Sequence, residues 1–398
     1  MAVGKQNRRS VPERSGPAIA RGRQMKRLFL LLCFLAGSLN AYAHKPSDSY
    51  LILKPSGNAV EGQWDISLRD LDFAIGLDTN GDAQITWGEV RAKHGEIAAY
   101  AMSRLALSNA GKGCPVSVSE HLIDEHTDGK YAVLRFTAQC ELPIDILGAR
   151  YGLFFDIDPQ HKGLLRLQYA GTTSSAIFTP DKAAQEFTLG RPDQLQQFLD
   201  FCGEGIWHIW IGFDHILFLL ALLLPAVLYR ENKQWNAVSA FAPAFWSVLK
   251  IVTAFTIAHS ITLSLATLGV VSLPSRLVES TIAASVVIAA MNNVFPLFSE
   301  RRWAMAFLFG LIHGFGFASV LSDLGLPQDA LLLTLIGFNV GVEVGQLAIV
   351  AVFLPIAFVL RRGLFYRKVV LIGGSLLIAI LALAWFIERA FDLEFLPF

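Results

Sequence analysis

Long apolar runs occupy the second half of the chain. From residue 204 onwards, predominantly apolar segments alternate with short charged loops, at about 204–228, 244–270, 278–298, 303–323, 329–360 and 369–389. Each segment is long enough to cross a bilayer core, which requires about 20 helical residues. The pattern predicts an α-helical polytopic membrane bundle of about six transmembrane helices over residues 204–398.

A shorter apolar run lies near the N-terminus. Lys26 and Arg27 precede the apolar stretch 28–39, and Ala41-Tyr42-Ala43 has the form of an A-x-A cleavage site. A run of about 12 residues is too short to span a membrane. We therefore expect a signal peptide over 25–43, with translation starting at Met25 and residues 1–24 a misassigned leader. A retained signal anchor is the alternative.

Strand patterns fill the segment between these apolar regions. Runs of β-branched and aromatic residues, bounded by Gly, Pro and Asp, occur at Ser49–Leu53, Tyr131–Ala138, Tyr151–Ile157 and Leu164–Tyr169. They predict a small β-rich periplasmic domain over 44–190, a sandwich or barrel, interrupted by a helical stretch at 88–107. A polar start followed by apolar spacing predicts an interfacial helix over 191–203.

The positions of the charged residues predict how the protein is oriented in the membrane, whereas their total says little about a binding partner. The totals of Lys+Arg and Asp+Glu are both 33, and only 17% of the residues are charged, against about 25% in soluble domains. We expect no nucleic acid partner, and no nucleotide, because a P-loop motif is absent.

Three of the loops between the apolar segments hold the basic residues Arg230, Lys233, Arg301, Arg302, Arg361, Arg362, Arg367 and Lys368. The positive-inside rule makes these loops cytoplasmic, which places the N-terminal domain and the C-terminus in the periplasm of a bacterial inner-membrane protein.

The cysteines divide by compartment. Cys114 and Cys140 flank the strand-rich middle of the exported segment, and an oxidising compartment favours a disulfide between them. Cys33 would leave with the signal peptide. Cys202 lies at the membrane boundary, where we expect a free thiol.

Residues 78–89 have the spacing of an EF-hand loop. Oxygen-bearing residues stand at the calcium-ligand positions: Asp78, Asn80, Asp82, Gln84 through its backbone carbonyl, Thr86 and Glu89. The departure from the pattern is Ala83, at the position where glycine normally makes the sharp turn. We expect Ca²⁺ in this loop, and an acidic surface turn without an ion is the alternative.

Ionisable and amide side chains recur inside the apolar segments. Placing such a group inside a membrane costs free energy, and the residues that do so usually have a function. The candidates are His208, Asp214, His215, His259, His313, Asn339 and Glu343. Neutral imidazoles with carboxylates are ligands for first-row transition metals such as Ni, Co or Zn, so we expect one intramembrane metal site. A structural polar network is the alternative. On a continuous helix, His208 and His215 would lie two turns or ~10 Å apart on one face, with Asp214 pointing elsewhere. Gly337, Gly341 and Gly345 would let another helix approach closely.

These residues carry a family resemblance. His208-x3-Gly212-x-Asp214-His215 followed by Leu217–Leu220 resembles the signature of the HupE/UreJ family of membrane proteins. Four further stretches resemble the branch with a large exported N-terminal domain: Ala43-His44-Lys45-Pro46-Ser47, the Thr-Ala-Phe-Thr-x-Ala-His-Ser run at 253–260, 313–318 and 338–346. Two departures are the five residues between His208 and Asp214, where nickel/cobalt permeases have four, and Ile209 in place of a proline. The resemblance implies nickel or cobalt uptake.

Three functions fit this pattern. The first is a secondary nickel/cobalt-type divalent metal permease, whose ligands would be distributed in depth. The second is an intramembrane metal-dependent hydrolase, with three ligands converging on Zn²⁺ and Glu343 or Asp214 as general base. The third is a membrane scaffold with a structural polar core. Separately, His44 would become the mature N-terminus, where its amine and imidazole could together bind a divalent ion such as Cu²⁺.

Overall fold

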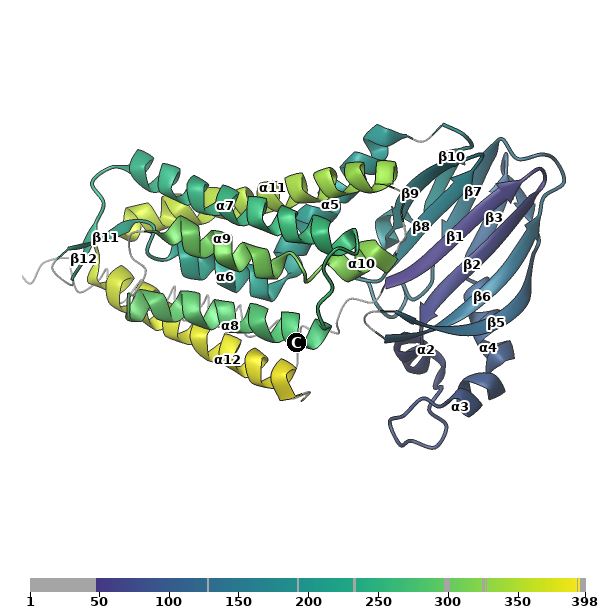
Figure 1. The fold of residues 1–398 in the computed structure, drawn as a ribbon, viewed down its shortest axis with the longest axis horizontal. Coiled ribbons are helices and arrows are strands. Elements are labelled where there is room, and N and C mark those ends of the chain that lie inside the picture. The colour runs from purple at the N-terminus through teal and green to yellow at the C-terminus, as the bar shows by residue number, and fades with distance from the viewer. Residues whose placement is uncertain are drawn as a thin grey trace, which may run out of the picture. The chain divides into compact units, whose positions relative to one another are not determined.

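The computed structural model describes residues 48–126, 129–191, 193–231, 234–296, 301–323, 326, 328–391 and 393. The predicted signal peptide over 25–43 and His44 lie outside the described residues. A β-rich region comes first along the chain and is followed by a bundle of helices (Figure 1). This order confirms the predicted fold class.

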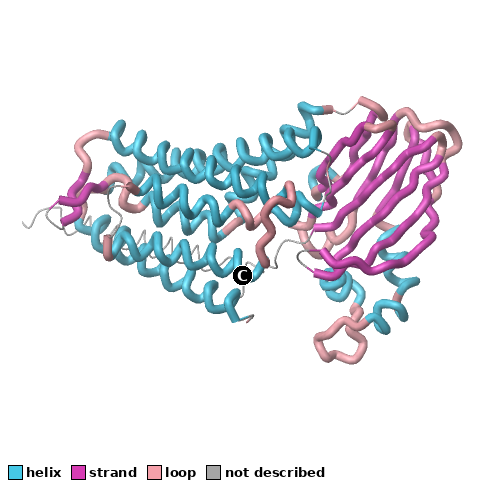
Figure 2. Tube along the Cα trace, in the orientation of Figure 1, coloured by secondary structure: helices cyan, strands magenta, loops and turns pink. Residues whose placement is uncertain are grey.

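Two sheets form the β-rich region (Figures 1 and 2). The larger has the order β5-β6-β2-β1-β8-β9 and the smaller the order β10-β7-β3-β4. The strands of the larger sheet are β1 Asp48–Ser56, β2 Ala59–Ser67, β5 Val116–His126, β6 Gly129–Gln139, β8 Lys162–Tyr169 and β9 Thr172–Phe178. Those of the smaller are β3 Leu105–Asn109, β4 Lys112–Cys114, β7 Ile146–Tyr151 and β10 Ala184–Thr188. β1 pairs antiparallel with β2 and parallel with β8.

Both sheets contribute to one apolar core. Leu51 and Trp64 from the larger sheet and Leu107 and Leu147 from the smaller are almost completely buried in the same cluster. On β1, Leu51 and Leu53 enter this core while Ile52 and Lys54 do not, as the alternation of side chains along a strand requires. The region is therefore a β-sandwich, one of the two architectures that the strand pattern predicts.

The predicted strands at 49–53, 131–138 and 164–169 are confirmed, and the one at 151–157 is wrong. β7 ends at Tyr151, and the backbone N–H groups of Ile157 and Asp158 both donate to the carbonyl of Phe154. Phe154 has φ +59°, so the chain buries it by turning rather than by extending.

The helical content of the β-rich region also differs in detail. The helical stretch expected at 88–107 is two short helices, α3 Trp87–Ala92 and α4 His94–Met102, and β3 begins at Leu105. The strand begins there because Leu105 and Leu107 point into the sandwich core. Helix α2 Leu68–Ile75 and the short turn η1 Pro180–Lys182 were not predicted.

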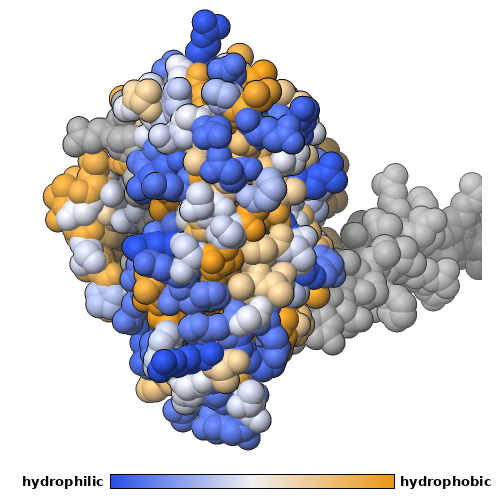
Figure 3. Space-filling model, turned by 90° about the vertical axis from the view of Figure 1, so that its right-hand side faces the viewer, coloured by the Kyte–Doolittle hydropathy of each residue, from blue (hydrophilic) through white to orange (hydrophobic). Residues whose placement is uncertain are grey.

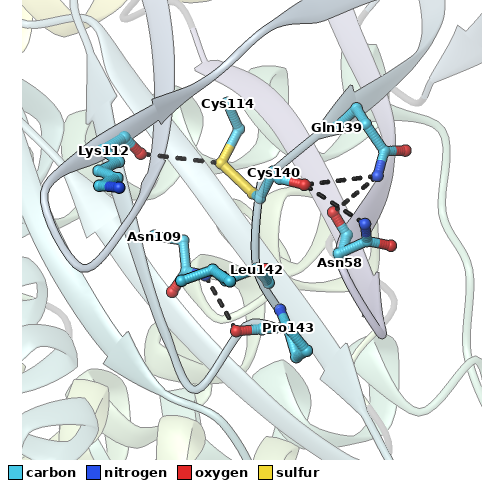
Figure 4. Close-up of a disulfide and its surroundings, with 8 residues drawn as sticks. All are labelled: Asn58, Asn109, Lys112, Cys114, Gln139, Cys140, Leu142 and Pro143. Carbon is cyan, nitrogen blue, oxygen red and sulfur yellow. Dashed lines mark hydrogen bonds between the residues drawn. A yellow bond between two sulfur atoms is a disulfide. The ribbon is translucent and has the colours of Figure 1, made fainter.

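A disulfide joins Cys114 to Cys140, as predicted (Figure 4). It links the end of β4 in the smaller sheet to the residue after β6 in the larger sheet. The backbone of Cys140 is also bonded to Asn58, whose carbonyl accepts from the Cys140 N–H and whose side chain donates to the Cys140 carbonyl. Cys202 is a free, partly buried thiol.

The second half of the chain is helical. Its helices are α5 Gln194–Ile211, α6 Phe213–Leu223, α7 Phe241–Thr267, α8 Ser275–Val294, α9 Arg302–His313, α10 Ala318–Asp323, α11 Gln328–Leu360 and α12 Gly374–Phe391. The π-helical turns η2 Tyr366–Gly373 lead into α12, and a hairpin of β11 Leu228–Glu231 and β12 Gln234–Ala237 connects α6 to α7. Helix α5 continues without a break through residue 203, where the sequence pattern predicts the boundary between an interfacial helix and the first span.

Four of the described helical segments are long and apolar enough to cross a membrane: Phe241–Thr267, Ser275–Val294, Ala330–Leu360 and Tyr366–Phe391. A fifth crossing results if α5 and α6, which meet at an angle of 71°, are counted as one broken span. The span predicted at 303–323 is not one helix, because α9 ends after 12 residues. At 1.5 Å per residue that is a length of about 18 Å, which falls short of the bilayer core.

The surfaces of the two regions differ as a membrane protein requires. Viewed from the side on which the strands lie in Figure 1, the surface is largely hydrophilic with scattered hydrophobic residues (Figure 3). On the helices, by contrast, large apolar side chains such as Trp246, Val352 and Ile380 are more than half exposed. Exposed apolar surface of this extent is typical of contact with lipid.

Glycines bring α5 and α11 into backbone contact. A Cβ added to Gly341 would lie 2.0 Å from the carbonyl oxygen of Cys202, and one added to Gly205 would lie 2.0 Å from that of Phe338. Gly337 and Gly345 face the backbone of α5 in the same way, at Phe198 and Ile206. The predicted close approach of a second helix is confirmed, and that helix is α5.

We therefore expect Gly205→Ala to destabilise the bundle, because two backbones would have to separate. Overpacking costs roughly 1–3 kcal/mol, and the loss should appear as less monodisperse protein in size-exclusion chromatography of detergent extracts. Gly203→Ala on the same helix is the control, since a Cβ there meets nothing within 4 Å. Equal recovery of the two variants would contradict the packing argument.

Candidate metal centre

The α5–α6 break at Gly212 determines the positions of the first two histidines. The Gly212 N–H donates to the His208 carbonyl and ends α5, and α6 then leaves at 71°. A Cβ on Gly212 would lie 2.7 Å from that carbonyl oxygen and 3.0 Å from Nδ1 of His215. The prediction of a continuous helix with these rings ~10 Å apart is wrong, because the bend brings their centroids to 4.5 Å.

A second break positions His313. Helix α9 ends at this residue, and residues 314–317 form a turn before α10 begins. Gly314 lies against α7, where a Cβ would come within 2.4 Å of the His259 carbonyl oxygen. The end of α9 therefore lies against the helix turn of α7 that carries His259.

The two breaks and α7 bring four histidines and one aspartate together. Potential ligand atoms of His208, His215 and His259 lie within 4.8 Å of one another, and so do those of Asp214, His215 and His313. His215 belongs to both groups, and its ring centroid is 5.0 Å from that of His313. The structure thus brings five of the seven predicted site residues into one cluster.

Each of three histidines is held through one ring nitrogen. Nδ1 of His215 is 3.0 Å from Oδ1 of Asp214, Nδ1 of His259 is 3.4 Å from Oδ1 of Asn339, and Nε2 of His313 is 2.9 Å from Oγ of Ser285. Such partners orient imidazoles at metal sites and raise their basicity as ligands. Asp214 therefore lies beside its neighbour His215 rather than pointing elsewhere.

The opposite nitrogens of these three rings, and one nitrogen of His208, are buried without a hydrogen-bond partner among the described residues. They are Nε2 of His208, His215 and His259, and Nδ1 of His313. A buried polar atom without a partner costs about 1–3 kcal/mol, so four of them in one cluster are unusual for a structural network. The donor set fits a divalent transition metal, for which unprotonated imidazole nitrogens are ordinary ligands.

Aromatic rings surround the cluster. Phe317 and Phe338 lie 5.1 and 5.3 Å from His208 between ring centroids, and Phe218 and Phe255 lie 4.9 and 5.3 Å from His313. His259 and His313 are completely buried. The apolar surroundings keep water from the unpartnered nitrogens.

Asn339 and Glu343 belong to neither of the two groups of converging ligand atoms. Asn339 contacts the ring of His259, whereas Oε1 of Glu343 accepts from Thr253 Oγ1 and belongs to neither group of converging ligand atoms. Gln346 follows on the same face and contacts Thr256. Ser285, which contacts His313, was not among the predicted site residues, although a serine within an apolar helix is a usable signal.

The acidic loop at 78–89 is folded around its own carboxylates. Asp78 accepts from the backbone N–H groups of Gly81 and Ala83, and Asp82 accepts from that of Gln84. The Asn80 side chain accepts from the Asp82 N–H. Ala83 has φ +60°, the left-handed conformation that favours glycine, so the chain makes the sharp turn despite the substitution.

Glu89 closes this loop. Its carboxylate accepts from the backbone and hydroxyl groups of both Thr79 and Thr86 and forms a capping box at the start of α3. Hydrogen bonds from Thr86, followed by those from Thr79, lower the pKa of Glu89 to about 2. The carboxylate is thus ionised at neutral pH, as a calcium ligand must be.

We expect the loop to bind Ca²⁺ and Glu89→Gln to weaken binding roughly tenfold or more, because a bidentate anionic ligand is lost. Calorimetric titration of the detergent-solubilised protein with CaCl₂ measures this. The control is Glu96→Gln, which removes an exposed carboxylate outside the loop. An absence of calcium heat in the folded wild-type protein would leave only the acidic surface turn.

Comparison with known proteins matches residues 184–389 to the family model described as HupE / UreJ protein. The matched residues include helices α5 to α11, α12 up to residue 389, and all the histidines and the aspartate of the cluster, and they exclude most of the β-sandwich. No curated protein matches the chain significantly.

Proposed function

Since the chain belongs to the HupE/UreJ family of membrane proteins, we propose that it is a secondary permease for a divalent transition metal of the nickel/cobalt type. The observation that carries the proposal is the set of four buried ring nitrogens without hydrogen-bond partners among the described residues. The four histidines that carry them belong to the two converging ligand groups, inside a helical bundle whose exposed apolar surface fits a bilayer.

Two overlapping ligand groups suit transfer better than permanent retention. An ion held by His208, His215 and His259 can pass to Asp214, His215 and His313 without leaving His215, because His215 belongs to both groups. Conduction requires binding strong enough to admit the ion and divided enough to release it. Discontinuous helices that meet at the substrate site, as α5/α6 and α9/α10 do, are a recurrent feature of secondary transporters.

The arrangement is less suited to an intramembrane hydrolase. Three histidines with an open fourth position would satisfy zinc, but Glu343 is bonded to Thr253 and stands outside both ligand groups. Asp214 is engaged by the N–H and the ring of His215. Neither carboxylate is placed as a free general base, which disfavours the hydrolase. The hydrolase and the scaffold remain as alternative outcomes of the transport experiment below.

We expect His215→Ala, His259→Ala and His313→Ala each to reduce uptake of Ni²⁺ or Co²⁺ by roughly 100-fold, since loss even of outer partners of metal ligands costs 10–100-fold. Uptake into proteoliposomes, with the protein amount equalised, measures this. His121→Ala in the β-sandwich is the matched control and should transport normally.

Uptake at the wild-type rate by all three variants would overturn the permease. Wild-type protein that fails to transport but retains stoichiometric zinc would favour the hydrolase. Wild-type protein that neither transports nor binds metal would favour the scaffold.

We also propose that the end of the bundle at the β11–β12 hairpin is cytoplasmic. Arginines from two other predicted cytoplasmic loops gather there: Arg302 donates to the Pro225 carbonyl, Arg361 to that of Val238 and Arg367 to that of Trp235. One end of the bundle thus collects basic residues from separate loops, which the positive-inside rule assigns to the cytoplasm of a bacterial inner membrane. The β-sandwich would then be periplasmic.

Orientation is testable with single cysteines on a Cys202→Ser background. A membrane-impermeant maleimide added to intact spheroplasts should label Lys130→Cys on the β-sandwich and leave Arg230→Cys on the hairpin unlabelled. Both positions are exposed, so both should react after the membrane is permeabilised. The reverse pattern in intact spheroplasts would invert the topology.

A further inference from the structure

A strip of acidic residues leads along α5 to the metal centre. Asp200, Glu204 and His208 follow one another at intervals of four residues, so they lie on one side of the helix. Next to this strip, α5 is fixed to α11: Gly205 meets its backbone, and the side chain of Gln197 donates to the Ala330 carbonyl and to Thr334 Oγ1. The position of the strip is therefore set by helix packing.

Both carboxylates of the strip are paired with lysines from the β-rich region. Nζ of Lys182 lies 2.7 Å from each carboxylate oxygen of Asp200, and Lys162 forms an ion pair with Glu204. The side chains of Asp200 and Glu204 are each only 12% exposed, and that of Lys162 is 14% exposed. The Lys162–Glu204 pair is therefore largely withdrawn from solvent and is screened less than a surface ion pair, whereas the side chain of Lys182 is 36% exposed.

The backbone of Lys162 is held firmly. The preceding residue, His161, is fully buried, with Nε2 2.6 Å from the hydroxyl of Tyr151. The following residue, Gly163, lies on the Tyr151 ring, where an added Cβ would come within 2.6 Å. Lys162 thus extends from a fixed point at the start of β8, and only its side chain is left to move.

One turn beyond Glu204, the strip is no longer paired: Nε2 of His208 is buried without a partner among the described residues. We propose that Asp200 and Glu204 form the path by which a divalent cation reaches His208, and that Lys182 and Lys162 are resident cations that the ion displaces in turn. This inference rests on the permease proposed above. A doubly charged ion attracts a carboxylate about twice as strongly as an ammonium group at equal distance. Monovalent ions have no such advantage, so the lysines select for divalent charge.

The test compares opposite changes in the same ion pair. Lys162→Gln removes the competing cation and should lower the KM for Co²⁺ uptake into proteoliposomes about fivefold, close to 1 kcal/mol. Glu204→Gln removes the receiving carboxylate and should raise this KM about fivefold while kcat is retained. Lys182→Gln, one turn further from His208, should lower KM by less.

A purely structural ion pair makes a different prediction. Breaking it from either side would change KM in the same direction, so shifts of equal sign would overturn the inference, as would no shift in either variant. Lys112→Gln breaks an exposed Lys–Glu pair elsewhere in the β-sandwich and is the matched control, expected at wild-type KM. Lys162→Arg, which retains the charge, should also remain near wild type.

The two proposals can fail separately. Wild-type protein without Co²⁺ uptake would overturn the permease and the path together. Wild-type uptake that depends on His215, with Lys162→Gln and Glu204→Gln failing to move KM oppositely, would overturn the path alone. If either glutamine variant is poorly recovered, Lys182→Gln supplies the decision, because an unchanged or raised KM contradicts displacement.

Discussion

The candidate metal centre depends on one backbone constraint, the break between α5 and α6 at Gly212. Continuous helical geometry would separate His208 and His215 by two turns, whereas the bend places their rings 4.5 Å apart between centroids. Any side chain at Gly212 would collide with the His208 carbonyl oxygen, 2.7 Å from where its Cβ would lie. The break therefore requires glycine for steric reasons, and it brings two histidines of one apolar run together from two different helices. Gly314 allows α9 to place His313 against α7 in a similar way.

In the bundle around this break, several histidine rings have one nitrogen with a hydrogen-bond partner and one nitrogen that is buried without a partner among the described residues. Asp214, Asn339 and Ser285 each contact one nitrogen of a histidine ring, while the opposite nitrogens of these three rings and Nε2 of His208 are buried without a partner among the described residues. Leaving four such atoms without hydrogen bonds costs several kcal/mol in total. Close packing of α5 on α11 and of α9 on α7 supplies contacts that offset this cost. The cost is understandable if the atoms are ligands, because a bound cation would satisfy them.

The sequence predicted the identity of the site more reliably than its geometry. Histidines and carboxylates stand out in apolar segments because burial without a purpose is expensive, so each member of the cluster could be recognised one by one. The break could not be predicted, because a single glycine inside an apolar run is compatible with a continuous helix, and Gly212 acts only through contacts made in the folded chain. For a related reason, spacing placed Glu343 on the face of Asn339 but did not reveal its bond to Thr253. In the β-sandwich, residues 151–157 had the composition of a strand, but Phe154 is buried through a turn.

The chemistry along α5 changes in the order that a hydrated cation would need. Carboxylate oxygens are hard ligands that attract any divalent ion, including Mg²⁺ and Ca²⁺, and at Asp200 and Glu204 they are neutralised by lysines. Imidazole nitrogens bind first-row transition metals in preference to those hard ions, and they begin at His208. An ion that displaces the lysines by charge alone would still have to exchange water for nitrogen at the break in α5. Selection for charge on α5 and for metal type at the histidines would then be separate steps, and the order of the residues along one helix would determine the order of the steps.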